Sequence, residues 1–554
     1  MPADWNSLPL EIRWMVRDYI KSLRSTATDI PYRQLLLVCR EWHSWFVHEN
    51  FRLLVLDQDR LSDFEKMVSN NKVRRNYVQR IVLRIRLPDY DCPACDEEED
   101  DATACANDEA FIEVLRRFMT IMSAWPKREH NSGITLDLGA YSPSDGRHGF
   151  RDYRFSDQYQ YGAPETSHEQ HADVLCRAQE AGENQKSTCP GWNRSCNDEC
   201  SSPSLSSKKR ILATIGDVRR RHFSEVFTEG HWDTQPHTVL KGIVSAPAIT
   251  SLVLPRHYYR PISLLVLGCV IRQGFPSLQS LRRETWRAIG VPARQSMGGY
   301  QDLFAALPTT IDHFSLLCEL KNTHVGLPIT LSIMYQPHFG GVDMGLAAAT
   351  LARRLRSFCA TYTVSFEDFV EGDLRRGRRV HPQLEHLVMT SEILEARVSC
   401  RAPEFFGLIY MAGRFAFVSM PNLKSLILWD GDKSDGFLMR FTYTYLTSNE
   451  TEQGGWQPTV DCRGTRYARK DLLPAFTKLR DVLRLILPPA TPYMRFIFKR
   501  SRTAGGKEEA EGEGEQVNRR RITKGPEFQE VRNFILDPES AKQRLFERRV
   551  SAMH

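Results

Sequence analysis

The sequence predicts an α/β protein: a helical module at the N-terminus, an irregular solenoid of parallel strands backed by helices, and a small β-hairpin toward the C-terminus, with disordered insertions between them. Three observations predict this fold. Apolar residues recur at helical spacing near the N-terminus, a proline-led leucine pattern returns several times along the chain, and a stretch of alternating apolar and polar residues follows the last copy.

Residues 1–50 form the predicted helical module. Pro9 stands in the first turn of a helix, where its missing N–H is harmless, and Ile12, Met15 and Tyr19 then recur at steps of three and four. A second helical run follows a polar break and shows the apolar residues Leu35, Leu36, Val38, Cys39, Trp42 and Phe46. Because about 50 residues bury too little surface to be stable alone, we expect the module to pack on a partner or on the rest of the chain.

Two strings in this module resemble the F-box family. They are Leu8-Pro9-Leu10-Glu11-Ile12 and Leu35-Leu36-Leu37-Val38-Cys39-Arg40-Glu41-Trp42. The resemblance implies a three-helix fold that docks on an SKP-type adaptor of a cullin–RING ubiquitin ligase. It implies these adaptor-binding residues: Leu8, Pro9, Ile12, Met15, Leu35, Val38, Cys39 and Trp42. The break between the helices lacks the acidic-leucine pair that is common in the family, and the alternative is an ordinary helical hairpin of a larger domain.

Residues 51–139 read as the first strand and helix units of the solenoid. Apolar runs predict strands at 51–56, 78–87 and 134–138, and helical spacing predicts a helix over 111–125. Residues 89–108 are acidic and small, which predicts a solvated loop. Residues 140–207 lose all apolar periodicity, and we expect a disordered insertion there.

A degenerate repeat of the form P-x-L-x-x-L-x-L marks residues 208–430. Its copies begin at Pro247, Pro276, Pro308, Pro382 and Pro421, the second being incomplete and the third carrying an insertion. Helical stretches are predicted between the copies, at 262–273, 301–306, 346–362 and 405–417. Strand then helix, repeated at intervals of about 30 to about 40 residues, is the pattern of a leucine-rich-repeat-like solenoid. The interval from Ile311 to Leu384 is doubled, so one unit is hidden or replaced there. The alternative is a non-repeating α/β domain whose strands happen to follow prolines.

Residues 431–490 predict a β-hairpin from 437–446 and 455–460, followed by a closing helix near 470–487. Residues 491–554 form a charged tail that we expect to be largely disordered.

The sequence contains few motifs that indicate catalysis or the binding of a metal, a cofactor or a nucleic acid. Cys92 and Cys95 have zinc-knuckle spacing, with Cys105 following, but a fourth ligand is missing nearby, so these are weak metal candidates. Phosphate-binding loops, zinc-protease motifs and nucleophile elbows are absent from the sequence, and we expect neither enzymatic activity nor a cofactor. The net charge of +6 in 554 residues is too small to indicate a nucleic-acid partner, and no apolar run is long enough for a membrane span. Many of the thirteen cysteines stand in apolar contexts, which favours the cytoplasm or the nucleus.

The body of the chain resembles a group of filamentous-fungal F-box proteins with an uncharacterised C-terminal domain. The resemblance spans most of residues 5–490. It rests on Phe51-Arg-Leu-Leu, the segment 80–91, Gly413-Arg, and Met420-Pro-Asn-Leu-Lys-Ser-Leu-Ile-Leu-Trp. It implies a substrate receptor that recruits a target protein to the ligase, with catalysis left to the partners. Two alternatives remain open: a scaffold that acts outside any ligase, and a nucleic-acid- or zinc-binding protein.

Overall fold

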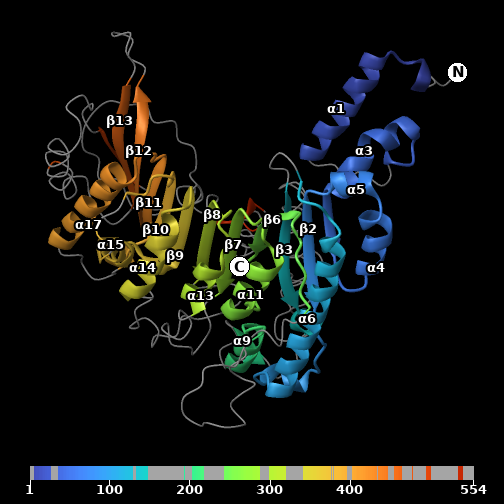
Figure 1. Ribbon diagram of the computed structural model, residues 1–554, viewed down its shortest axis with the longest axis horizontal. Coiled ribbons are helices and arrows are strands. Elements are labelled where there is room, and N and C mark those ends of the chain that lie inside the picture. The colour runs from blue at the N-terminus through green and yellow to red at the C-terminus, as the bar shows by residue number, and fades with distance from the viewer. Residues whose placement is uncertain are drawn as a thin grey trace. The chain divides into compact units, whose positions relative to one another are not determined.

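The computed structural model has a mixed α/β fold with mostly parallel strands (Figure 1). The residues that it describes are 5–26, 35–128, 133–147, 192–193, 202–216, 242–286, 299–319, 341–375, 377, 380–395, 402–432, 435–446, 455–464, 477, 495–500, 535–538 and 540. The chain divides into two compact units. Unit 1 comprises Met1–Leu278, Lys321–Ile329 and Pro538–His554, and unit 2 comprises Gln279–Leu320 and Thr330–Asp537.

Unit 1 contains a parallel sheet of strands in chain order, β1 (Leu53–Leu56), β2 (Arg80–Arg86), β3 (Ile134–Tyr141) and β6 (Ile249–Leu254). Ile81, Leu136 and Leu252 lie side by side in register, and each is fully buried. Its helices are η1 (Trp5–Ser7), α1 (Leu10–Thr26), α3 (Arg40–Arg52), α4 (Leu61–Phe64), η2 (Glu65–Ser69), α5 (Lys72–Tyr77), η3 (Pro93–Asp96), α6 (Asp101–Ser123), α7 (Pro143–Arg147), α9 (Leu205–Ile211) and α11 (Leu264–Gly274). A two-residue pairing joins β4 (Trp192–Asn193) to β5 (Ser202–Pro203).

The expected solvated loop at 89–108 is wrong in its second half. Helix α6 begins at Asp101, because the side chain of Asp100 caps it by accepting a hydrogen bond from Thr103 N at 2.8 Å. The predicted insertion 140–207 also differs from the structure at both ends. β3 runs to Tyr141 with α7 directly after it, and α9 begins at Leu205. The rest of that range lies outside the described residues, apart from 192–193 and 202–204.

Unit 2 contains a sheet in which β7 (Ser280–Trp286), β8 (His313–Glu319), β9 (Ser357–Ser365), β10 (His386–Thr390) and β11 (Ser425–Asp432) are parallel and follow chain order. β12 (Asp435–Leu446) and β13 (Gly455–Gly464) then pair antiparallel, which confirms the predicted hairpin, and β14 (Arg495–Arg500) pairs parallel to β13. Its helices are α13 (Gly299–Ala306), α14 (Gly341–Ala352), α15 (Phe366–Arg375), α16 (Glu392–Glu395), α17 (Ala402–Arg414) and η6 (Phe415–Ser419).

Each parallel strand of unit 2 from β8 to β11 is preceded by the same turn. The backbone N–H groups of Ile311, Leu355, Leu384 and Leu423 each donate to the carbonyl three residues earlier, at 3.2 to 3.3 Å. Just before each of these strands, two consecutive N–H groups donate to a single carbonyl next to the preceding strand, at 2.8 to 3.1 Å. The four accepting carbonyls belong to Gln279, Asp312, Arg356 and Glu385. The same turn precedes β2 and β6 of unit 1, at Val78 and Ile249. The repeat is therefore a backbone pattern as well as a sequence pattern.

The core of unit 2 lies between these strands and the helices on one face. Leu281, Phe314, Phe358, Leu387 and Leu426 form one row across five strands, each no more than 1% exposed. Phe314 contacts Phe304 of α13, and Phe358 contacts Phe369 of α15, with ring centroids 5.3 and 5.8 Å apart. Helices α14, α15 and α17 lie together beside β9 to β11 in Figure 1. Burial of each such side chain contributes about 1.5–3 kcal/mol.

The predicted helix over 346–362 is wrong in its second half. α14 ends at Ala352, and Ser357 begins β9, which supplies the unit missing between Ile311 and Leu384. Leu355, Phe358 and Ala360 occupy the repeat's three apolar positions and are buried. The expected tail at 491–554 also differs in part, because 495–500 form β14 and 535–537 are buried. The closing helix at 470–487 lies outside the described residues, apart from Thr477.

Within the part of the chain that the structure describes, no helix combines the length and the apolar character needed to cross a bilayer.

Candidate functional site

Large apolar side chains of α1 and of the turn before α3 face solvent, among them the following five. Ile12, Met15 and Tyr19 of α1 are 42%, 66% and 62% exposed, and Leu37 and Val38, which precede α3, are 85% and 58% exposed. We call these five residues the N-terminal apolar surface. Ile12, Met15 and Tyr19 recur at steps of three and four, so they share one face of α1. Exposed apolar side chains on one helix face mark a surface that is covered by a partner in many proteins.

Polar and aromatic contacts hold α1 against α3. Arg13 Nη1 of α1 lies 2.7 Å from Glu41 Oε2 of α3, and Trp5 Nε1 donates to the same oxygen at 2.8 Å. The Trp5 ring packs edge-on against Trp42 at 5.2 Å, and the guanidinium of Arg17 lies 5.8 Å from the ring centre of Trp45. Because these contacts use the side of α1 that carries Arg13 and Arg17, the side with Met15 stays uncovered.

Helix α3 packs against α5 and against the segment that leads into β2. Phe46 is fully buried, and the ring of His48 lies 6.2 Å from that of Tyr77 in α5. The N–H of Gln79, just before β2, donates to the carbonyl of Arg52 at 2.9 Å. The two helices are therefore presented on the first strands of the sheet.

The eight residues that the F-box resemblance implies are placed differently from one another. Ile12, Met15 and Val38 belong to the N-terminal apolar surface, and Pro9 is exposed beside it. Leu8, Cys39 and Trp42 are half-buried, whereas Leu35 is only 7% exposed and packs inside. Leu37 was not on that list, although its place in the Leu35–Trp42 string was a signal. Residues 27–34, where the family's middle helix would begin, lie outside the described residues.

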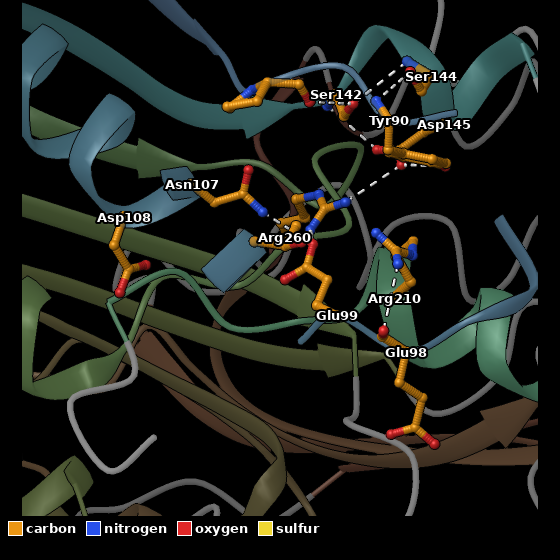
Figure 2. A network of polar contacts seen from close by, with 12 residues as sticks. Tyr90, Glu98, Glu99, Asn107, Asp108, Ser142, Ser144, Asp145, Arg210 and Arg260 are labelled. Carbon is orange, nitrogen blue, oxygen red and sulfur yellow. Dashed lines mark hydrogen bonds and ion pairs between the residues drawn. The ribbon is translucent and has the colours of Figure 1, made fainter. Parts of the chain in front are cut away.

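A buried polar network lies in the segments that follow β2, β3 and β6 (Figure 2). Arg260 is at its centre, 2% exposed, and its guanidinium pairs with Glu99 and, at 3.4 Å, with Asp145. Tyr90 donates its hydroxyl to Asp145 at 3.0 Å, and Asn107 of α6 donates its amide to Glu99 at 3.0 Å. Sequence analysis missed this network, because Glu99 read as one residue of a solvated acidic run and Arg260 stood in no motif.

Burial and charge shift the pKa values in this network. Burial raises the pKa of Tyr90, and the neighbouring carboxylate of Asp145 raises it further, so the phenol stays protonated. Burial alone would lower the pKa of Arg260, but Asp145 and Glu99 outweigh it and the net pKa is raised. Both carboxylates accept hydrogen bonds and face a permanent cation. The network therefore joins the three segments that follow β2, β3 and β6 through paired and buried charges.

Helix α9 adds basic residues to the edge of the network. Arg210 donates to the carbonyls of Glu97 and Glu98 at 2.7 and 3.3 Å, and its guanidinium lies 4.9 Å from the ring centre of Tyr90. Lys209 pairs with Glu98 at 2.6 Å. The acidic residues 97–99 are thus held by basic side chains distant in sequence.

A second group of basic residues surrounds His257, which follows β6. His257 is buried, with 7% of its surface exposed, and burial lowers the pKa of its imidazole to about 3, with further lowering by Arg84, Arg256 and Arg80. Arg80 pairs with Asp137 on β3 at 2.6 Å. His257 is therefore neutral over the physiological range.

The weak metal candidates are not brought together as a site. Cys95 is buried and Cys92 and Cys105 are half-buried, and among the described residues no three histidine, cysteine or acidic side chains are placed to hold a metal ion.

Comparison with known proteins yields one match. Residues 306–477 match a family model described as "Family of unknown function (DUF6546)", which covers most of unit 2 from β8 to β13. No curated protein and no solved structure shows significant similarity to the chain.

Proposed function

We propose that this protein is an F-box substrate receptor that docks on an SKP-type adaptor of a cullin–RING ubiquitin ligase. The observation that carries the proposal is the N-terminal apolar surface. The two strings that resemble the F-box contain Ile12, Leu37 and Val38. Ile12 is exposed on α1, which the Arg13–Glu41 pair holds against α3, and Leu37 and Val38 are exposed in the turn before α3. Apolar anchors on short helices are the usual means by which such modules fill a partner's groove.

The remainder of the chain supplies the target-binding part of the proposal. The strands of each unit follow chain order, and the same turn precedes β2, β6 and β8 to β11, which supports a leucine-rich-repeat-like solenoid. Repeat sheets of this kind offer an extended surface to another protein. In this proposal ubiquitin transfer belongs to the ligase partners, and the protein itself selects the target.

The test is binding of the full chain to a purified SKP-type adaptor. Met15→Glu and Val38→Glu place a charge on the N-terminal apolar surface without touching a buried side chain, and each should weaken adaptor binding at least tenfold, which corresponds to about 1.4 kcal/mol. Met67→Glu is the matched control, because Met67 is also in unit 1 and 54% exposed. Isothermal titration calorimetry measures the affinities of the wild-type chain and of the three variants.

The proposal would be wrong if the wild-type chain does not bind the adaptor, or if Met67→Glu weakens adaptor binding as much as the other two variants. Co-purification then separates the receptor from a scaffold that acts outside a ligase. Recovery of adaptor together with cullin supports the receptor, and recovery of adaptor without cullin supports the scaffold.

A further inference from the structure

The face of the unit 2 sheet opposite its helices is occupied by a segment from near the C-terminus. On this face lie Glu284 of β7 and Ser315 of β8, because they alternate with Leu281 and Phe314, whose row packs against the helices. Ser315 Oγ donates to the carbonyl of Ile535 at 3.0 Å, and Glu284 Oε1 accepts the N–H of Asp537 at 2.6 Å. More than two hundred residues separate each pair along the chain.

The segment is held as a bound peptide would be. Ile535 and Leu536 are each 1% exposed and Asp537 is 5% exposed, so two apolar side chains are removed from water. The two printed hydrogen bonds engage the segment's backbone, which any sequence possesses, while the buried side chains set a preference for apolar residues. Contacts to a ligand's main chain that give affinity, combined with buried apolar side chains that give specificity, are common features of peptide recognition.

The sheet residues are themselves buried in the presence of the segment. Glu284 is 1% exposed and Ser315 is 7% exposed. A carboxylate and a hydroxyl on a sheet face are well suited to a ligand that brings its own N–H and C=O groups, because burial of either without a partner is costly.

We propose that this face of unit 2 is a binding site for short peptides that bury two adjacent apolar side chains, and that residues 535–537 occupy it as an intramolecular competitor. The identity of the competing peptide as a target segment rests on the proposed function, whereas the site itself does not. A target would have to displace Ile535-Leu536-Asp537 before it binds.

The experiment uses the full chain with a site-specific protease sequence inserted within the glycine- and glutamate-rich stretch 505–515. A labelled peptide with the sequence of residues 533–541 is titrated before and after cleavage and dialysis, and anisotropy reports binding. A tethered segment competes at an effective concentration on the order of millimolar, so cleavage should strengthen peptide binding at least 100-fold. Failure of the cleaved chain to exchange its segment for peptide would overturn the proposal, because the segment would then be a permanent part of the fold.

Two variants keep the result interpretable. Leu536→Asp in the uncleaved full chain should raise peptide affinity at least tenfold, since it weakens only the competitor. Ser315→Ala in the cleaved chain should lower peptide affinity about threefold to tenfold through loss of one hydrogen bond. A peptide carrying Leu536→Asp should not bind, and equal binding of it would count against the site. The adaptor takes no part in these measurements, so their outcome is independent of the adaptor test.

Discussion

Arg260 illustrates how much of unit 1 depends on one side chain. It neutralises Glu99 from the segment before α6 and Asp145 from α7, and these three side chains are all less than 5% exposed. Removal of one partner from a buried ion pair leaves the other charge without compensation, and that penalty exceeds the net worth of the pair.

We predict that Arg260→Met lowers the free energy of unfolding of unit 1 by about 3–5 kcal/mol. Urea denaturation measures the change. Lys424→Met is the control, because its pair with Glu385 leaves Lys424 63% exposed and should contribute less than about 1 kcal/mol. Similar losses for the two variants would contradict the role given to the buried network.

His257 makes a prediction for pH. Its pKa in the folded protein is about 3, whereas an unfolded histidine titrates near 6.5, so the unfolded chain binds one more proton between these values. Stability therefore falls as pH drops through this window, by roughly 1.4 kcal/mol for each pH unit. In His257→Gln that contribution should vanish. The dependence of the unfolding free energy on pH between pH 6 and 4 should then become shallower by about 1.4 kcal/mol per pH unit.

At the scale of elements, the packing of α14 on α15 depends on two glycines. A Cβ at Gly345 would overlap the backbone carbonyl of Asp368, and a Cβ at Gly372 would overlap the backbone of Leu346. The two helices therefore approach each other more closely than any side chain allows. Gly407 in α17 differs, because a Cβ there meets nothing within 4 Å.

We predict opposite signs for alanine at these positions. Gly345→Ala should destabilise unit 2 by about 1–3 kcal/mol, because backbone cannot yield as a side chain can. Gly407→Ala should stabilise it by about 0.5–1 kcal/mol through helix propensity alone. Thermal unfolding of the two variants distinguishes these outcomes, and stabilisation by both would show that α14 and α15 can separate at little cost.

At the scale of the whole molecule, the sequence predicted strands best where leucine repeats at fixed spacing. The units at Leu384 and Leu423 were visible because proline and leucine both stand in place. The unit at Leu355 was hidden, because no proline precedes it and Phe358 and Ala360 replace leucine, so it read as a continuation of α14. Pairwise chemistry was harder to foresee. Glu99 and Arg260 are far apart in the chain, and only the parallel order of β2, β3 and β6 brings them together.

The candidate surface was predictable in the same uneven way. Helical spacing identified Ile12 and Met15 as apolar positions, and the resemblance added Val38. Neither could show that Leu35 is buried while Leu37 is 85% exposed, since that depends on how the segment turns before α3. The contacts of Ile535 and Asp537 could not be predicted from the sequence, because no local pattern indicates a segment whose partners lie more than two hundred residues away.

The carbonyls of Gln279, Asp312, Arg356 and Glu385 have a consequence for the evolution of unit 2. Each accepts two N–H groups from the segment that leads into the next strand, so these bonds link successive copies of the pattern. A duplicated or deleted segment that begins and ends at these positions preserves every such bond. The number of units, and with it the length of the sheet, can therefore change by recombination while the register of the remaining strands is kept.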